Sequence, residues 1–454
     1  MVKAKRFPAK WVFLLVLSIY LLTIGKGYYS TDGEVMLKLT WALVEQWKLG
    51  FPCEERLPNA PPGRDGLCYS KYGLGQSLAL IPFYLFGPNL HPLFPKGNPV
   101  LMGKWFADRA NSVFTALTAV LVGLWAFKLF GETDTAIALS LIYSLATMAW
   151  PYAKFNFNQP LTTLCLTAGF YALWCYKGEL SAALLSGLAF GWGFLTRISD
   201  IIALPWALLL WAYHKGRHLN VSHFWAWSTI ILITVALTVG YNFYAFGKLM
   251  GGYSGEKWST PLFVGLYGLL MSSGKSLFLF VPLTFLLPQA LAGFFKSGKR
   301  LEAIICGGLL VTYLVFYASF WTWHGGWSWG PRFLVPTMPF LVLPLGALWT
   351  DKHGKYAVLS IAAFSLVIQF LGVAVNFAEY MLEVNDETKI LFIPQYSPIL
   401  GHFYGLLHLK WPIDLAPADL SPFGLGKGYS ISLLAIYLLS LVWGLEGILR
   451  SLRQ

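Results

Sequence analysis

The segment that decides the fold is residues 11–24, WVFLLVLSIYLLTI, an apolar run that follows Lys3, Lys5, Arg6 and Lys10. A helix that crosses a bilayer needs about 20 mostly apolar residues, and basic residues at one end favour the cytoplasmic side. No small-residue cleavage site follows the run, so it is typical of a signal anchor. We therefore expect a membrane-spanning helix with a cytoplasmic amino terminus.

Apolar runs of the same kind recur along the rest of the chain. Of the 454 residues, 56% are apolar and 12% charged, against about 45–50% and about 25% in soluble domains, and the mean hydropathy is +0.58. Because backbone polar groups must be hydrogen-bonded inside hydrocarbon, the runs are expected to be helices, and they lack the alternation of a membrane barrel. The sequence predicts an all-α, polytopic transmembrane helical bundle of about 12 spans. After the first span they cover residues 105–127, 135–150, 160–176, 180–196, 201–213, 223–243, 277–295, 302–320, 333–349, 356–375 and 430–448.

The net charge of +12 is concentrated in the joints between the runs. Alternating the spans from the amino terminus places one set of joints in the cytoplasm, and each of these is basic, as the positive-inside rule requires. They contain Lys128, Lys177, His214–His218, Lys296–Arg300, Asp351–Lys355, and Arg450 with Arg453 in the tail. The pattern predicts a multi-pass protein of the inner or plasma membrane with both termini cytoplasmic, in contact with membrane lipids and not with nucleic acid.

The remaining polar residues are concentrated on the non-cytoplasmic side, chiefly in an outer loop at residues 25–104. Within it, residues 31–49 predict an amphipathic surface helix, and residues 77–86, too short to span, predict a juxtamembrane helix. The expected organisation is a transmembrane catalytic module that includes this loop (1–376), an outer loop or small cap (377–429), and the last span with a cytoplasmic tail (430–454).

The five cysteines fall into two groups. Cys165, Cys175 and Cys306 lie within apolar runs and are expected to be apolar filler. Cys53 and Cys68 lie in the outer loop, which is an oxidising place if the membrane faces a periplasm, an exterior or a lumen. A disulfide between them would close that loop and have a structural role.

Two acids, Asp32 and Glu34, flank Gly33 at the start of the outer loop. A partly desolvated carboxylate there can accept a proton from an incoming hydroxyl, and Asp32 is the candidate catalytic residue for that step. The pair are also candidate ligands for a divalent cation, Mg²⁺ or Mn²⁺. The alternative is that Thr31 or Asp32 caps the helix that follows.

Several cationic residues are placed on the non-cytoplasmic side, where positive-inside bias makes them unexpected. Arginine and lysine suit phosphate oxygens, so Lys71, Arg332, Arg109, Arg197 and Lys154 are candidate ligands for a phosphate-bearing donor. Asp108 and Asp200 could instead pair with Arg109 and Arg197. We therefore rank Lys71 and Arg332, which have no acid beside them in the sequence, above those two arginines.

Tryptophans 321, 323, 327 and 329 form a dense cluster that could stack on a sugar ring or a prenyl chain, or belong to the interfacial aromatic belt. His324, within the cluster, is a candidate ligand or base, or a hydrogen-bonded part of the scaffold. The segment 272–276, SSGKS, resembles a phosphate-binding loop but has Leu269 where that pattern needs glycine. It is expected to be a tight turn with Lys275 near an outer anionic group.

These features together resemble the GT-C membrane glycosyltransferases. Asp32 just past the first span, an amphipathic helix and then residues 69–75, YSKYGLG, resemble the first outer loop of that superfamily. Within it the chain most resembles the branch that contains the dolichyl-phosphate-mannose protein mannosyltransferases and the lipid A aminoarabinose transferase. Further similar segments are residues 187–200 (GLAFGWGFLTRISD), 241–253 (YNFYAFGKLMGGY) and 327–333 (WSWGPRF).

The resemblance implies a polyprenyl-phosphate sugar donor, a hydroxyl acceptor, inversion at the anomeric carbon and a catalytic acid in the first loop, which corresponds to Asp32. Tyr72, Trp327 and His324 are expected to contact the substrate. Two departures are plain: Gly33 separates an Asp-Glu pair that is usually adjacent, and Asn158 or Gln159 stands where the second outer loop often has an acid.

The expected function is transfer of a hexosyl or pentosyl group on the non-cytoplasmic face, to a glycan, a lipid or a protein hydroxyl. A lipid-linked sugar flippase or other transporter is an alternative, but it would need polar groups near mid-membrane and typically a repeat, and neither is found. A non-catalytic scaffold for envelope assembly would account for the bundle and leave the outward cations unexplained.

Overall fold

The computed structural model describes residues 6–25, 29–54, 57, 59–215 and 219–453, and within them the chain is helical with no strand. Of the basic residues considered above, Lys3, Lys5 and His218 lie outside the described residues, as does Arg217 in the same joint. The only extended pairings in the described part are two isolated bridges, which join Cys68 to Phe51 and to Pro62. The predicted all-α fold is confirmed.

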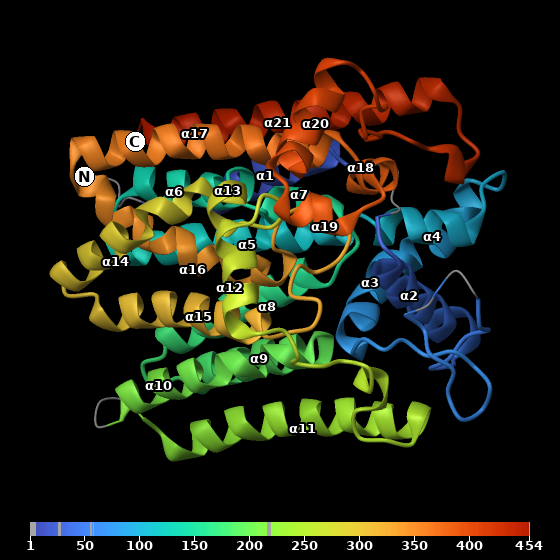
Figure 1. Cartoon of the computed structure of the whole chain (residues 1–454), viewed down its shortest axis with the longest axis horizontal. Helices are drawn as coiled ribbons and strands as arrows, with labels where there is room; N and C mark the ends of the chain where they lie inside the picture. Colours follow the sequence, from blue (N-terminus) through green and yellow to red (C-terminus); the bar gives the residue numbers. More distant parts are fainter. Residues whose placement is uncertain (1–5, 26–28, 55–56, 58, 216–218, 454) are drawn as a thin grey trace.

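Most of the long helices run side by side along the longest axis of the molecule (Figure 1). Six segments of the described chain are long and apolar enough to cross a membrane, and five shorter apolar helices accompany them. The six are Pro99–Phe130 (α4 Pro99–Ala107 with α5 Ala110–Phe130), α11 Val221–Phe246, α15 Arg300–Ala318, Arg332–Trp349, α17 Lys352–Ala374 and α21 Lys427–Leu452. The shorter ones are α1 Ala9–Leu22, α6 Thr133–Leu145, α9 Leu180–Thr196, Ile198–His214 (with α10 Leu204–His214) and α12 Leu262–Met271. A bundle of about 12 spans stays a prediction.

The region from residue 244 to 296 differs from the sequence prediction. The expected span at 277–295 is broken into α13 Leu277–Phe280, a 3₁₀ turn Pro282–Leu286 and α14 Leu287–Lys296. Pro282 and Pro288 stand at the starts of the last two pieces, because proline lacks the N–H that a continuing helix needs. The apolar helix α12 lies inside the segment expected to be an outer loop, and it runs across the long helices (Figure 1).

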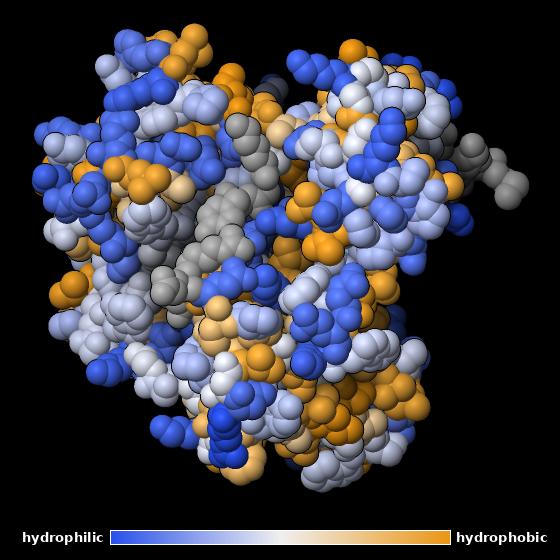
Figure 2. Space-filling model, turned by 90° about the vertical axis from the view of Figure 1, so that its right-hand side faces the viewer, coloured by the Kyte–Doolittle hydropathy of each residue, from blue (hydrophilic) through white to orange (hydrophobic). Residues whose placement is uncertain are grey.

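The two ends of the bundle are different. Helices α1 and α21 pack against each other in antiparallel fashion, with Leu15 against Gly444 and Trp11 against Gly447. The joints α10–α11 and α14–α15 lie at the same end as the termini, whereas α2 Thr31–Trp41, α3 Leu74–Leu90 and α18 Phe377–Val384 gather towards the other (Figure 1). We call the latter the loop end; Figure 2 views it and shows polar side chains around a hollow between two lobes.

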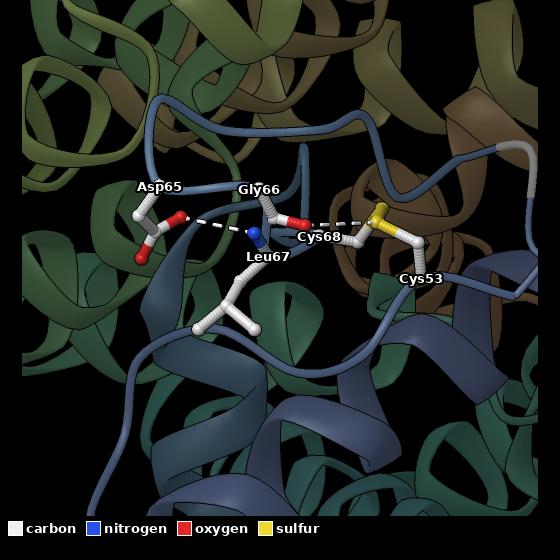
Figure 3. Close-up of a disulfide and its surroundings, with 5 residues drawn as sticks. All are labelled: Cys53, Asp65, Gly66, Leu67 and Cys68. Atoms are coloured by element: carbon white, nitrogen blue, oxygen red, sulfur yellow. Dashed lines mark hydrogen bonds between the residues drawn. A yellow bond between two sulfur atoms is a disulfide. The ribbon is translucent and has the colours of Figure 1, made fainter.

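The outer loop forms much of the loop end. The predicted amphipathic helix is α2, extended by a π-helical turn Ala42–Gln46 and ended by Trp47, which has a left-handed backbone (φ 55°) and a 91% exposed side chain. The predicted juxtamembrane helix is α3, longer than expected at both ends. Cys53 and Cys68 form a disulfide that clips the loop between these helices, beside the turn at Asp65 (Figure 3). The predicted disulfide is confirmed.

The remaining helices connect the bundle and cover the loop end. In the middle of the chain these are α7 Ala149–Lys154, α8 Gln159–Trp174 and α16 Met338–Val342. Beyond α17, α18 is followed by α19 Glu387–Phe392 and α20 Pro398–Leu407 before the chain re-enters the bundle as α21. Residues 377–426 thus form short helices and turns at and near the loop end (Figure 1).

Candidate active site

Asp32 lies in the first turn of α2, where its side chain is free of the capping role considered above. The helix is capped by Ser30, whose hydroxyl oxygen accepts a hydrogen bond from the backbone N–H of Gly33 at 3.1 Å. Serine is a favoured N-cap because its oxygen satisfies an N–H that has no partner within the helix. The alternative in which Thr31 or Asp32 caps the helix is therefore wrong, and the Asp32 carboxylate is directed elsewhere.

The Asp32 carboxylate lies against Arg332, 300 residues away in sequence. Arg332 Nη1 is 3.0 Å from Asp32 Oδ2, and the side chains are only 15% and 13% exposed. The second carboxylate oxygen accepts a hydrogen bond from the Asn59 amide at 2.7 Å. Burial raises the pKa of the Tyr72 phenol well above its usual value, and the nearby charge of Asp32 raises it further. Asp32, Tyr72 and Arg332 are therefore brought together, as the proposed site requires.

Arg332 opens the 3₁₀ segment Arg332–Thr337 and is positioned by aromatic rings. Its guanidinium lies 4.8 Å from the ring centre of Phe157 and 5.1 Å from that of Phe333. Its Nε is buried and has no hydrogen-bond partner within the described chain. The guanidinium thus contacts Asp32 with one edge and retains donor capacity for an anion.

Arg197 approaches the same ring from another side. It follows α9, is 7% exposed, and donates a hydrogen bond to the Tyr317 hydroxyl. Its guanidinium is 5.2 Å from the Phe333 ring centre, so both arginines lie against one phenyl ring. Nη1 of Arg197 is buried with no partner among the described residues. Arg332 and Arg197 are thus two guanidinium groups with spare donors that share an aromatic neighbour.

A close backbone contact places the YSKYGLG segment beside Arg197. A Cβ on Gly73 would lie 2.1 Å from the carbonyl oxygen of Leu195, so only glycine allows this approach. The Trp192 indole N–H also donates to the carbonyl of Gly75 at 3.1 Å. The resembling segments 69–75 and 187–200 thus pack directly on each other.

Lys71 is not free of acidic partners, contrary to the ranking made from the sequence. Its ammonium is 3.2 Å from Glu256 Oε1, and the other Glu256 oxygen accepts a hydrogen bond from the Trp321 indole at 2.7 Å. Conversely, no ion pair within 4.0 Å joins Arg109 to Asp108 or Arg197 to Asp200 in the described structure. Neighbours in the sequence were a poor guide here, because the real partners come from distant loops.

The other predicted cations form a second cluster on the opposite side of α2. Glu34 pairs with Lys104 at 2.7 Å, whereas Arg109 stacks on Trp105 with its guanidinium 3.3 Å from the ring centre. Lys154 is buried and pairs with Asp414 at 2.9 Å. Lys104, Arg109 and Lys154 line a cavity of about 210 Å³ with Asp108 and Asp419. The structure does not bring Arg109 and Lys154 into contact with Asp32.

The candidate cation ligands Asp32 and Glu34 also diverge. Residues two apart on a helix point in different directions, and here one carboxylate faces Arg332 while the other faces Lys104. Among the described residues, no group of three or more His, Cys, Asp or Glu side chains is arranged to hold a metal ion. The two carboxylates are therefore not arranged to share a cation.

The tryptophan cluster divides into two pairs. Trp323 and Trp329 are 5% and 0% exposed and belong to the core, so they do not stack on a ligand. Trp321 and Trp327 are about half exposed, at 50% and 46%. Trp321 contacts the site by donating a hydrogen bond from its indole N–H to Glu256. Trp327 lines a small aromatic crevice with Tyr29 and Phe157.

His324 holds the loop that contains it. Its Nδ1 is 3.0 Å from Glu387 Oε1 and 3.1 Å from the backbone nitrogen of Gly326, and it hydrogen-bonds to one of them at a time. The hydrogen bond to Glu387 lowers the pKa of that carboxyl. These contacts fit a hydrogen-bonded scaffold, and contact of His324 with the substrate stays a prediction. Asn158 and Gln159 are buried, and the Asn158 amide donates to the Thr196 carbonyl at 3.4 Å.

The sequence reading missed Asn59, Glu256 and Tyr253. Asn59 and Glu256 directly contact Asp32 and Lys71, and burial raises the pKa of Tyr253, which lies close to Arg197 and Glu256. Tyr253 is the last residue of the segment 241–253, which was noted from the sequence, and Glu256 follows three residues later. Extending that segment by a few residues would have included both. Asn59 carried no signal, because an asparagine in a proline-rich loop is ordinary turn chemistry.

The chain resembles known proteins over different extents. Residues 103–241 match the dolichyl-phosphate-mannose-protein mannosyltransferase family. A segment covering 30% of the chain is 27% identical to undecaprenyl phosphate-alpha-4-amino-4-deoxy-L-arabinose arabinosyl transferase of Edwardsiella ictaluri, and a segment covering 22% is 33% identical to the protein of that name from Yersinia enterocolitica serotype O:8. These segments span 27% and 19% of the two relatives, well under two thirds of their lengths.

The fold extends the resemblance to nearly the whole chain. The crystal structure of ArnT from Cupriavidus metallidurans bound to undecaprenyl phosphate superposes with a TM-score of 0.50 at 14% identity, covering 95% of this chain and 77% of that one. At this identity the likeness concerns the fold alone. The chain thus resembles the lipid A aminoarabinose transferase branch of the GT-C membrane glycosyltransferases, in fold over almost its full length and in sequence over part of it.

Proposed function

We propose that the protein is a glycosyltransferase that moves a sugar from a polyprenyl-phosphate donor to a hydroxyl acceptor on the non-cytoplasmic face of the membrane, with inversion. The observation that carries the proposal is the contact of Asp32 with Arg332 at the loop end, beside Arg197 and Lys71. The names of the relatives and the undecaprenyl phosphate in the ArnT structure support the class of donor.

In the proposed reaction, a lone pair of the acceptor oxygen attacks the anomeric carbon while Asp32 takes the hydroxyl proton. The bond between that carbon and the phosphate oxygen breaks, and polyprenyl phosphate leaves with the electron pair. Arg332 and Arg197 hold unpaired N–H groups that can stabilise the charge that develops on the phosphate. Lys71 is expected to contribute once Glu256 releases it.

The proposal also concerns the kind of sugar that is transferred. We infer a pentosyl group, because both curated relatives are named as arabinosyl transferases. A matched set of pentosyl and hexosyl polyprenyl phosphates would distinguish the two. The acceptor is proposed only as a hydroxyl group, on a glycan, a lipid or a protein.

The test is release of polyprenyl phosphate by purified protein supplied with a polyprenyl-phosphate sugar and candidate acceptors. Asp32→Asn should fold, bind donor and be inactive, whereas Asp65→Asn, on the exposed turn of the same outer loop, should retain activity. Normal turnover by Asp32→Asn would refute the role of Asp32. Absence of release from every donor, with the protein folded, would refute the proposed function; a flippase or a scaffold predicts no release.

A further inference from the structure

Lys275 is a fully buried lysine that the proposed reaction does not use. It lies in the turn between α12 and α13 and is 2% exposed, among the largest side chains that are completely buried. The sequence placed it near an outer anionic group; its amine is hydrogen-bonded to backbone carbonyls of a loop, and the Glu387 carboxylate acts on it from beyond ion-pair distance. A buried lysine is costly unless its N–H groups are satisfied.

Three acceptors surround the Lys275 nitrogen. They are the carbonyl oxygens of Ser328 at 2.6 Å and Gly326 at 2.9 Å, and the Ser328 hydroxyl oxygen at 3.1 Å. An ammonium has three N–H donors and no acceptor, so it matches this set. A neutral amine would keep two N–H donors and would need the Ser328 hydroxyl to turn and donate to its lone pair. The ammonium donates to all three oxygens, and its bonds to the two carbonyls are the stronger, charge-assisted kind.

The clamped segment leads directly into Arg332. Its glycines 325, 326 and 330 all have positive φ values, a backbone conformation that other residues rarely adopt. A Cβ on Gly325 would lie 2.6 Å from Cγ of Arg332, so this loop is packed against the arginine side chain. A shift of residues 326–328 would consequently move the guanidinium that contacts Asp32.

The turn that carries Lys275 is itself fixed from the other side. The backbone N–H of Gly274 donates to the Leu391 carbonyl at 3.2 Å, and the Ser397 hydroxyl donates to the Ser273 carbonyl at 2.9 Å. A Cβ on Gly274 would meet the Ile390 carbonyl at 2.4 Å. The segment after α18 therefore supports the turn, and the turn supports the arginine loop.

We propose that Lys275 is a positioning residue for the Asp32–Arg332 pair: its ammonium clamps residues 326–328, and loss of its proton loosens that loop and slows glycosyl transfer. The effect on glycosyl transfer rests on the proposed function, whereas the clamp can be measured without any transfer assay.

The charges around Lys275 set the pH range. Burial and then the charge of Arg332 lower the pKa of Lys275, whereas Glu387, which is paired with His324, raises it, and together they bring it to about 7. The clamp is thus complete below about pH 7 and weakens as the pH rises through that value. Glu387 is ionised throughout, because the hydrogen bond from His324 lowers its pKa.

Hydrogen exchange tests the clamp directly. Backbone protection of residues 325–331, corrected for the intrinsic effect of pH, should fall in the natural protein between about pH 6 and pH 9. It should be low at every pH in Lys275→Met and high at every pH in Lys275→Arg, while Lys389→Met, which alters an exposed lysine, should follow the natural protein. Protection that does not change with pH in the natural protein would overturn the proposal, even if the variants fail to fold.

Turnover of the same proteins tests the positioning role. Lys275→Met should lower kcat by about tenfold or more at unchanged donor KM, because Arg332 acts on the leaving phosphate. Lys275→Arg should extend activity to higher pH, which a purely structural lysine would not do. An unchanged kcat in Lys275→Met would overturn the role. If hydrogen-exchange protection falls as expected but neither the natural protein nor any variant transfers a sugar, the proposed function is refuted and the clamp is still supported.

Discussion

At the scale of single residues, the site depends on which charges face each other across distant loops. Asp32 has both carboxylate oxygens occupied, one by Arg332 and one by Asn59. Lys71 is held by Glu256 in the same region. The ligand-free site is therefore a set of internal pairs, and a phosphate-bearing donor must exchange some of them for its own oxygens.

Arg332→Ala should remove one donor to the leaving phosphate and leave Asp32 without its cation. Loss of one preorganised donor costs about 10²–10³ in rate, so kcat for polyprenyl phosphate release should fall by that factor. Arg332→Lys should recover only part of the loss, because an ammonium lacks the planar fork of guanidinium. An Arg332→Ala protein with normal kcat in the purified assay would show that this arginine does not act on the leaving group.

Glu256→Gln should make donor binding tighter. The ion pair of Glu256 with Lys71 is partly exposed, at 15% and 22%. If the donor must break this pair to bind, removing it should make the binding free energy more favourable by up to about 1 kcal/mol, or about fivefold in donor affinity. Titration with polyprenyl phosphate measures the change, and Lys71→Gln should weaken binding. Weaker binding by Glu256→Gln would indicate that the carboxylate contacts the ligand itself.

From the sequence, residues were singled out where a charge was unusual for its place, and the structure brings two of them, Asp32 and Arg332, together. Asp32 was chosen as an acid at the start of the outer loop, and Arg332, Arg197 and Lys71 as cations placed on the non-cytoplasmic side. Their partners were not, because a neutral Asn59 and a loop Glu256 look ordinary in a linear sequence. Which side chains pair depends on their proximity in three dimensions, and the neighbouring residues in the sequence do not indicate it.

At the scale of elements, the site is assembled by close packing of the outer loop on the end of α9. The contact at Gly73 leaves no room for a side chain. Most helices were located from the apolar runs, and α9 was predicted with its observed bounds. The run at 277–295 was misjudged, because hydropathy averages over prolines that interrupt the helix, and α12 was missed because ten residues are too few for a span.

Gly73→Ala should separate these two elements. The added Cβ would lie 2.1 Å from the Leu195 carbonyl oxygen, and such overpacking costs about 1–3 kcal/mol of folding free energy. Thermal unfolding in detergent and the transfer assay should both show a loss. Gly240→Ala, in α11 with open space around it, is the control and should lower neither, because alanine favours a helix interior. A Gly73→Ala protein with normal stability and activity would contradict this packing.

At the scale of the whole molecule, the segment after α17 is tied to the bundle by a buried ion pair. Lys154 and Asp414 are 2% and 7% exposed at 2.9 Å, and the lysine also donates to the Val373 carbonyl at 2.7 Å. From the sequence, Lys154 was a candidate ligand of the donor phosphate, because it was placed on the non-cytoplasmic side with the other candidate cations. Its partner lies 260 residues later, a distance at which a linear reading cannot assign contacts.

Lys154→Met should destabilise the whole fold, because it leaves a buried carboxylate without its cation. Breaking one side of a buried pair typically costs about 3–5 kcal/mol. The double variant Lys154→Met with Asp414→Asn should regain part of the loss, which a double-mutant cycle of unfolding free energies would measure. Equal stability of the single variant and the natural protein would mean that water replaces the lysine.

The antiparallel contact of α1 with α21 has a consequence for biogenesis. Residues 11 and 15 face glycines 447 and 444, so the surface of α1 that touches them is complementary to a helix synthesised more than 400 residues later. During translation that surface must remain exposed to lipid or to the insertion machinery until α21 has been synthesised. Ribosomes stalled before α21 should therefore leave α1 open to crosslinking with insertion factors, and synthesis and insertion of α21 should end that crosslinking.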